Sequence, residues 1–266
     1  MKIYALIIPL IFFISACDSG PTLSNICQDH PELCQEFTED SWCKAERKNT
    51  IISSYQLQQT NNDKNKYTLL LDYEAYAKCV SFSTQIEHIK LKEKRTARIN
   101  NHEKVKQRIH QLSQETKDSK HPNLLYYHWS RYLDEDAIKH LLTMEGSGAL
   151  ETPTLQFNLA TYYTKIDRKK TLALLYHALE LYQPDAVLNT EIFQSLFTIY
   201  NHEKKHKQAY IWLKVWRLYD PENEVITEEN LLEFSEKHQI DAAFLNKVAS
   251  KTLNNIESAK FEAPKF

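Results

Sequence analysis

Two stretches of this sequence decide its fold. They lie 37 residues apart and read LATYYTKIDRKKTLALLYHALELYQPD (159–185) and LFTIYNHEKKHKQAYIWLKVWRLYDPE (196–222). Leucine, tyrosine and proline recur at the same places in both: Leu159 and Leu196, Tyr163 and Tyr200, Pro184 and Pro221. Self-similarity at a period of roughly 20–50 residues is typical of stacked supersecondary units. The apolar residues of each stretch have helical spacing, so the repeat predicts an all-α fold of stacked helix pairs.

The repeat extends beyond these two stretches. Each complete unit is predicted to contain two helices, namely residues 154–165 with 169–182, and 191–202 with 205–219. A weaker copy precedes them at an offset of 31 residues, and a degenerate pair of helices, 228–239 and 242–256, follows. Thr152 before Pro153 predicts an N-cap followed by proline at the first helical position. Three units and a cap are enough to bury a continuous core.

This part of the chain, residues 122–256, resembles the tetratricopeptide repeat (TPR) and its helix-pair relatives. The second unit has consensus-type residues at Phe193, Leu196, Tyr200, Ala209, Leu213 and Pro221. Trp216 and Leu172 depart from the pattern, because they stand where that family prefers alanine. The resemblance implies that the inner face of each unit's first helix binds a peptide or helix of another protein. The residues on that face are Thr154, Phe157, Thr161, Thr164, Glu191, Gln194, Thr198 and Asn201.

Composition excludes several classes of function. The chain has 266 residues, a formal net charge of −2 and only 3 glycines. So few glycines exclude the GxGxxG loop, the P-loop and the nucleophile elbow. Without a net positive charge there is no field to hold a nucleic-acid backbone, so we expect no nucleic-acid partner.

The N-terminus is typical of an exported protein. Lys2 precedes an apolar run, residues 3–15, which is short for a membrane span and suits a signal peptide. The four residues Ile14-Ser15-Ala16-Cys17 then resemble the bacterial lipobox. The alternative is an ordinary signal peptide with a chance cysteine at its end.

The lipobox resemblance implies that residues 1–16 are removed and that Cys17 carries a diacylglycerol anchor. Asp18 resembles the signal that retains enterobacterial lipoproteins in the inner membrane. We therefore expect a body that faces the periplasm and is tied to the cell membrane, with the inner membrane favoured.

Four further cysteines, Cys27, Cys34, Cys43 and Cys79, predict two disulfides, because an even number in an exported chain favours a disulfide framework. Residues 36–58 and 63–88 are expected to be helices joined by a polar turn. An antiparallel hairpin about that turn would place Cys43 opposite Cys79, which leaves Cys27 to pair with Cys34. Zinc coordination and a redox-active pair are the alternatives, but the spacings fit neither a zinc knuckle nor a C-x-x-C motif.

A basic stretch follows these helices, with Lys90, Lys92, Lys94, Arg95, Arg98, Lys104, Lys106 and Arg108. It could be a membrane-surface or nucleic-acid helix. We interpret it as a solvated helical face instead, because Glu87, Glu93 and Glu103 interrupt the positive charge.

The sharpest chemical motif is His202-Glu203-x-x-His206, the H-E-x-x-H pattern of zinc hydrolases. It falls at the turn between the two helices of the second unit, so we interpret it as a solvated turn and expect no metal and no cofactor. The clustered aromatic residues, Tyr126, Tyr127, Trp129, Tyr132, Tyr210, Trp212, Trp216 and Tyr219, are interpreted as core of the stacked helices.

The whole chain resembles an uncharacterised gammaproteobacterial lipoprotein family of unknown function. We expect a lipidated tether with a small cysteine loop (17–34), a helical head (35–118), a TPR-like domain (122–256) and a flexible tail (257–266). The expected function is a non-enzymatic scaffold or adaptor that binds another cell-envelope protein. A zinc hydrolase and a self-associating structural protein are the alternatives.

Overall fold

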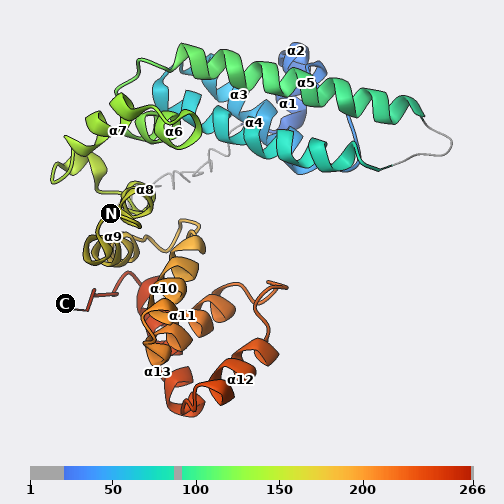
Figure 1. The fold of residues 1–266 in the computed structure, drawn as a ribbon. Helices are drawn as coiled ribbons and strands as arrows, with labels where there is room; N and C mark the ends of the chain where they lie inside the picture. Colours follow the sequence, from blue (N-terminus) through green and yellow to red (C-terminus); the bar gives the residue numbers. More distant parts are fainter. Residues whose placement is uncertain (1–20, 87–91, 265–266) are drawn as a thin grey trace, which may run out of the picture. The chain divides into compact units, whose positions relative to one another are not determined.

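The computed structural model describes residues 21–86 and 92–264. The chain divides into two units, residues 1–119 and 120–266, whose described parts we call the head and the repeat unit. All regular structure in these described residues is helical, with no strand, which confirms the all-α prediction (Figure 1). None of the described helices has both the length and the apolar character needed to cross a bilayer. The predicted signal peptide, Cys17 and Asp18 lie outside the described residues.

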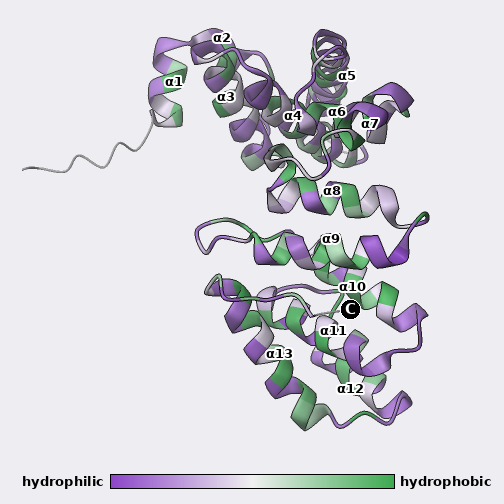
Figure 2. Ribbon diagram, turned by 90° about the vertical axis from the view of Figure 1, so that its left-hand side faces the viewer, coloured by the Kyte–Doolittle hydropathy of each residue, from purple (hydrophilic) through white to green (hydrophobic). Residues whose placement is uncertain are grey.

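The head contains α1 (Leu23–Asp29), α2 (Pro31–Gln35), α3 (Lys44–Gln59), α4 (Asp63–Ser83) and α5 (Lys92–Glu115). Helix α4 packs between α3 and α5, and its buried face includes Leu70, Tyr73 and Tyr76. Figure 2 shows that the head helices carry hydrophobic and hydrophilic residues on the same helix. The turn between α3 and α4 forms as predicted, because the Asn62 side chain accepts a hydrogen bond from Asn65 N at 2.8 Å and caps α4.

The helix predicted to begin at Glu36 begins at Lys44 instead. Residues 36–43 are non-helical, and Phe37 within them is buried against Tyr73 and Tyr76. This segment is held in place by hydrogen bonds to α5, a helix 50 residues or more further along the chain. Those bonds compete successfully with helix formation, so local periodicity predicted the wrong start.

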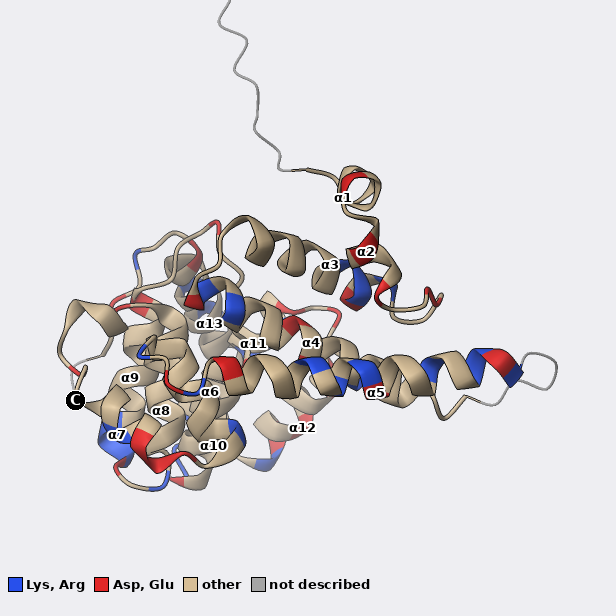
Figure 3. Cartoon of the chain, turned by 90° about the horizontal axis from the view of Figure 1, so that it is seen from above, with Lys and Arg blue, Asp and Glu red and all other residues tan. Residues whose placement is uncertain are grey.

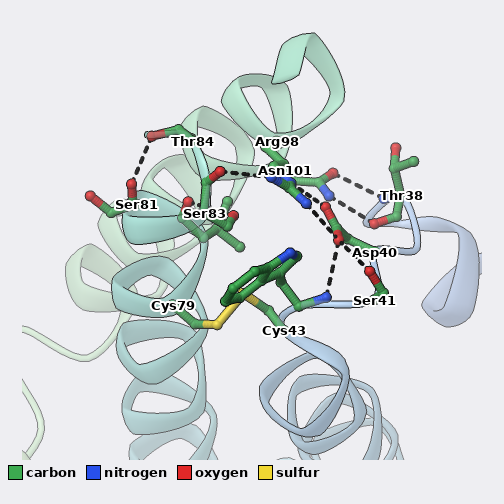
Figure 4. Close-up of polar contacts among 12 residues, drawn as sticks. Thr38, Asp40, Ser41, Cys43, Cys79, Ser81, Ser83, Thr84, Arg98 and Asn101 are labelled. Atoms are coloured by element: carbon green, nitrogen blue, oxygen red, sulfur yellow. Dashed lines mark hydrogen bonds and ion pairs between the residues drawn. A yellow bond between two sulfur atoms is a disulfide. The ribbon is translucent and has the colours of Figure 1, made fainter. Parts of the chain in front are cut away.

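Helix α5 holds this segment through one of its faces. It carries basic residues along its length (Figure 3), and one of them, Arg98, is 2% exposed. The Arg98 guanidinium forms a bidentate ion pair with Asp40 and donates to Ser83 O at 2.8 Å (Figure 4). Asp40 also accepts a hydrogen bond from Trp42 N at 3.0 Å. The interpretation of α5 as a solvated face is therefore wrong for Arg98.

The same face of α5 binds two more positions of the segment. Asn101 and the Thr38 backbone exchange two hydrogen bonds, of 2.9 and 2.8 Å (Figure 4). Lys104 donates to Glu36 O at 2.8 Å, and Arg108 pairs with the Glu36 carboxylate. Glu36, Thr38 and Asp40 of the segment thus contact α5, in antiparallel order. We call this set of contacts the α5 clamp.

Both disulfides form in the structure with the predicted pairing. Cys43 and Cys79 join the beginning of α3 to α4 with their Cα atoms 5.9 Å apart (Figure 4). Cys27 and Cys34 join α1 to α2 with a Cα separation of 5.5 Å. The first bridge lies next to the α5 clamp, so the end of the non-helical segment is held both covalently and by hydrogen bonds.

The repeat unit contains α6 (Pro122–Tyr132), α7 (Glu135–Leu142), a 3₁₀ turn η1 (Gly148–Leu150), α8 (Pro153–Tyr163), α9 (Arg168–Glu180), α10 (Glu191–His202), α11 (His206–Tyr219), α12 (Glu228–Lys237) and α13 (Ala242–Glu257). The pairs α6–α7, α8–α9 and α10–α11 each pack together. The predicted bounds of the four repeat helices are confirmed to within about two residues. Thr152 caps α8 by accepting from Leu155 N at 3.2 Å, with Pro153 at the first helical position.

The end of the repeat unit differs from the expected terminal helix pair. Helix α13 packs mainly on α11 rather than on α12, and Ala249, Leu253 and Ile256 join the core of the repeats. We expected residues 257–266 to be a flexible tail, but the Phe261 ring lies 6.2 Å from that of Tyr176, nearly parallel to it. Ala263 N donates to Glu180 at 2.7 Å. The described part of the tail therefore covers the same core.

The two disulfides are expected to stabilise the head unequally. Replacing Cys43 and Cys79 together by alanine should lower the free energy of unfolding by about 3–4 kcal/mol, because that bridge closes the longer loop in the chain-entropy model. The Cys27–Cys34 bridge has a sequence separation of only 7, so the matched Cys27→Ala/Cys34→Ala variant should lose about 2–3 kcal/mol. Urea unfolding followed by circular dichroism measures both. Equal losses would contradict the ranking.

Asp40 makes the stability of the head depend on pH. The hydrogen bond from Arg98 holds the pKa of Asp40 at about 2, below its usual 3.8. A carboxylate with a lowered pKa in the folded state stabilises at pH values above its unfolded pKa, and this stabilisation is lost as the pH falls through the folded value. We expect Asp40→Asn to lower the free energy of unfolding by about 1–2 kcal/mol at pH 7. This difference from wild type should disappear as the pH falls from 4 to about 2. Urea unfolding across this range tests it. Glu39→Gln, at the exposed neighbouring residue, is the control, and a cost for Asp40→Asn that is independent of pH would contradict the assignment.

Candidate functional site

The eight residues predicted to bind a partner lie on α8 and α10, the first helices of two repeats. Thr164 is the C-cap of α8, and the other seven lie within the two helices. Seven of the eight are exposed; Phe157 is half-buried and packs against the repeat core. The structure therefore leaves these side chains at the surface, apart from Phe157, whose ring contributes to packing.

The surface of these two helices is almost uncharged. Helix α8 contains no Lys, Arg, Asp or Glu, and Glu191 is the single such residue of α10 (Figure 3). The second helices differ, because α9 contains Arg168, Lys169, Lys170 and Glu180 and α11 contains Lys207, Lys214 and Arg217. Charge is thus unevenly divided between the two helices of each pair, although 26% of all residues are charged.

Tyr126 of α6 links this surface to the preceding pair. Burial raises the pKa of Tyr126, whereas a hydrogen bond with Thr161 and the charge of Arg131 oppose this increase. Tyr126 of α6 therefore lies beside Thr161 of α8, in keeping with the packing of α6 on α8. We call the exposed surfaces of α8 and α10, together with Tyr126 beside them, the first-helix face.

Three aromatic rings, those of Tyr126, Trp129 and Tyr162, lie together on α6 and α8, and the sequence did not predict this cluster. The ring of Trp129 lies 5.6 Å from that of Tyr126 and 5.3 Å from that of Tyr162, measured between centroids. All three are half-buried. The core interpretation is right for the buried residues Tyr127, Tyr210 and Trp212, whereas Tyr132 is 49% exposed and is not core. The remaining four rings of that prediction are half-buried and pack against core residues, namely Tyr126, Trp129, Trp216 and Tyr219. Helical spacing identified the aromatic residues but could not tell which of them reach the surface.

The H-E-x-x-H motif is interrupted by a turn, as its position predicted. His202 ends α10, His206 begins α11, and Lys204 between them has a left-handed φ of 58°. The motif needs a continuous helix to place two imidazoles on one face, and the left-handed residue breaks that continuity.

The three functional side chains of the motif also contact other residues: His202 and Glu203 both contact Arg168, whereas His206 contacts His238. Glu203 contacts Lys205 at 2.9 Å and Arg168 at 3.5 Å. The hydrogen bond from Lys205 lowers the pKa of Glu203 most, and the hydrogen bond from Arg168 lowers it further. The His206 ring stacks on that of His238 with centroids 3.7 Å apart, whereas His202 Nδ1 lies 3.3 Å from Arg168. Among the described residues, one set of Cys, His, Asp or Glu side chains is close enough to share a metal, Cys43, Glu46 and Cys79, and both of its sulfurs are in a disulfide.

Removal of metal is expected to leave the stability of this protein unchanged, since the motif does not converge on one point. Melting temperatures of the purified chain before and after EDTA treatment, read by differential scanning calorimetry, should agree to within about 2 °C. His206→Ala, measured with and without added zinc, is the control. A lower melting temperature after EDTA that zinc restores in the wild type but not in the variant would overturn this expectation.

Comparison with known proteins places the chain in a family. Residues 14–214 match the family described as protein of unknown function (DUF2989), and the chain belongs to it. The match spans the described head and the repeat unit as far as α11. No curated protein and no solved structure matches the chain.

Proposed function

We propose that this protein is a membrane-anchored periplasmic lipoprotein whose repeat unit is a non-enzymatic scaffold for another cell-envelope protein. The partner would contribute a peptide or a helix to the first-helix face. Thr154, Phe157, Thr161, Thr164, Glu191, Gln194, Thr198 and Asn201 are the residues proposed to receive it. The repeat unit is proposed to be related to the TPR family, whose first helices line the binding face.

The observation that carries this proposal is the contrast between the two helices of each pair. Helices α8 and α10 expose hydroxyl and amide side chains with a single charge, whereas α9 and α11 carry seven charged residues between them. The centres of protein interfaces are depleted in charged residues and enriched in aromatic ones. The half-buried rings of Tyr126, Trp129 and Tyr162 beside the neutral residues match that composition.

The proposed compartment rests on the sequence and on the disulfides. Two structural disulfides suit an oxidising compartment such as the periplasm. Ile14-Ser15-Ala16-Cys17 supplies the proposed lipidation site, and Asp18 favours the inner membrane. A second anchoring signal is unnecessary, because two or more acyl chains on one cysteine hold a protein stably on a bilayer.

Crosslinking in cells tests the proposed face. A Thr161→Arg/Thr198→Arg/Asn201→Arg variant places three cations on a surface on which Glu191 is the single charged residue of α8 and α10. We expect wild type to capture a specific envelope protein from membranes and this variant to lose most of that capture, because charges buried in an interface are costly to desolvate. Mass spectrometry of the crosslinked products identifies the partner.

The matched control carries the same three arginines on other helices, at the exposed residues Ala173, Gln208 and Ser250. It should capture the partner as wild type does, and circular dichroism should show that all three proteins fold. Equal capture by both variants would show that the first-helix face is not the contact. Capture of this chain alone would favour the self-associating alternative.

A further inference from the structure

A cleft in the head offers a second binding site that does not involve the first-helix face. Two adjoining cavities, of about 410 and 540 Å³, lie between α2, α3, α4 and α5. They share five lining residues, which are Leu33, Glu36, Gln58, Arg108 and Gln111. We call the two together the head cleft. Each cavity falls in the size range of ligand pockets, roughly 300–1,000 Å³.

The floor of the head cleft is aliphatic. Leu33, Leu69 and Leu112 line it while remaining at least 90% buried, and Leu57 lies beside them. Tyr73, the one aromatic side chain among the lining residues, is 5% exposed. Sugars are usually bound by stacking on exposed aromatic rings, which this lining lacks. An aliphatic side chain of a ligand fits the floor better.

The walls carry hydrogen-bonding groups with unused capacity. The side chains of Gln58, Asn61 and Gln107 make no hydrogen bond to other described residues. Each carboxamide offers both a donor and an acceptor, which is also what a peptide group offers. The side chains therefore match the main chain of an extended peptide.

Charge around the head cleft is balanced and partly neutralised within the wall. Lys66, Lys104 and Arg108 face Glu32, Glu36 and Glu115. Arg108 pairs with the Glu36 carboxylate and donates to Gln111 Oε1 at 3.1 Å, and Lys104 donates to Glu36 O at 2.8 Å. The hydrogen bond that Arg108 donates to the Glu36 carboxylate raises the pKa of Arg108. A strongly anionic or cationic ligand would meet like charges on either side.

We propose that the head cleft binds an extended, uncharged peptide segment of another protein, with one aliphatic side chain on the leucine floor. The carboxamides of Gln58, Asn61 and Gln107 pair with its peptide groups, as in other sites where main-chain hydrogen bonds give affinity and a pocket gives specificity. The α5 clamp fixes the wall, because Glu36 is held by both Lys104 and Arg108. The site is therefore formed before the ligand arrives.

A random dodecapeptide library displayed on phage, selected on the immobilised full chain, supplies the probe. Selected peptides are synthesised with a fluorescent label, and their affinity for the full chain is measured by fluorescence polarisation. We expect sequences of low charge with a recurrent aliphatic residue. Gln111→Trp, which fills the region shared by the two cavities, should weaken their binding at least about tenfold.

Gln114→Trp is the matched control, because Gln114 is exposed on the same helix and does not line the head cleft. It should bind the peptides as wild type does, and urea unfolding should show that both variants are folded. The Thr161→Arg/Thr198→Arg/Asn201→Arg variant should also retain full affinity, which separates this site from the first-helix face. Peptides that bind Gln111→Trp as tightly as wild type, or a selection in which no peptide exceeds its scrambled control, would overturn the proposal.

Discussion

The buried guanidinium of Arg98 is the constraint on which the head depends. A charge taken out of water must be paired and fully hydrogen-bonded, because its desolvation is otherwise uncompensated. Here Asp40 supplies the opposite charge and Ser83 O a further acceptor. These two partners come from the non-helical segment and from the end of α4, so one side chain of α5 fixes three parts of the head.

The consequences of this ion pair extend along the segment. With Asp40 fixed, Thr38 meets Asn101 and Glu36 meets Lys104 and Arg108. Phe37 is then directed against Tyr73 and Tyr76 in the core. Glu36 and Arg108 also line the head cleft, so the contacts that hold the segment give the cleft its shape. The contacts of Glu36 with Lys104 and Arg108 therefore both hold the segment in place and shape the proposed binding site.

The repeat unit depends on a different kind of constraint, the burial of large apolar and aromatic side chains between stacked pairs. Phe193, Leu196 and Trp212 lie in a core that α13 and Phe261 complete. Because an open repeat stack leaves its last apolar face exposed, a terminal cap is required. The side chains of this core come from α9, α11, α13 and the inward sides of α8 and α10. The outward sides of α8 and α10 are not buried in it, so they can carry polar residues. The head and the repeat unit are thus proposed to offer two separate binding surfaces.

Local sequence alone determined much of this protein. Apolar spacing and the 37-residue repeat gave the bounds of the helices from Pro153 to Tyr219, because each apolar stripe and each cap is encoded within a few residues. The turn at Asn62 made the pairing of Cys43 with Cys79 predictable, since an antiparallel hairpin leaves little choice of partner. Tertiary structure decided what depends on distant partners. Residues 36–43 are non-helical because Arg98 and Asn101 bind them. Trp129 is half-buried because it packs against Tyr162 of α8, and the head cleft exists because four helices leave a space. Hydrogen bonds and packing between residues far apart in the chain have no local periodicity, so only the folded structure reveals them.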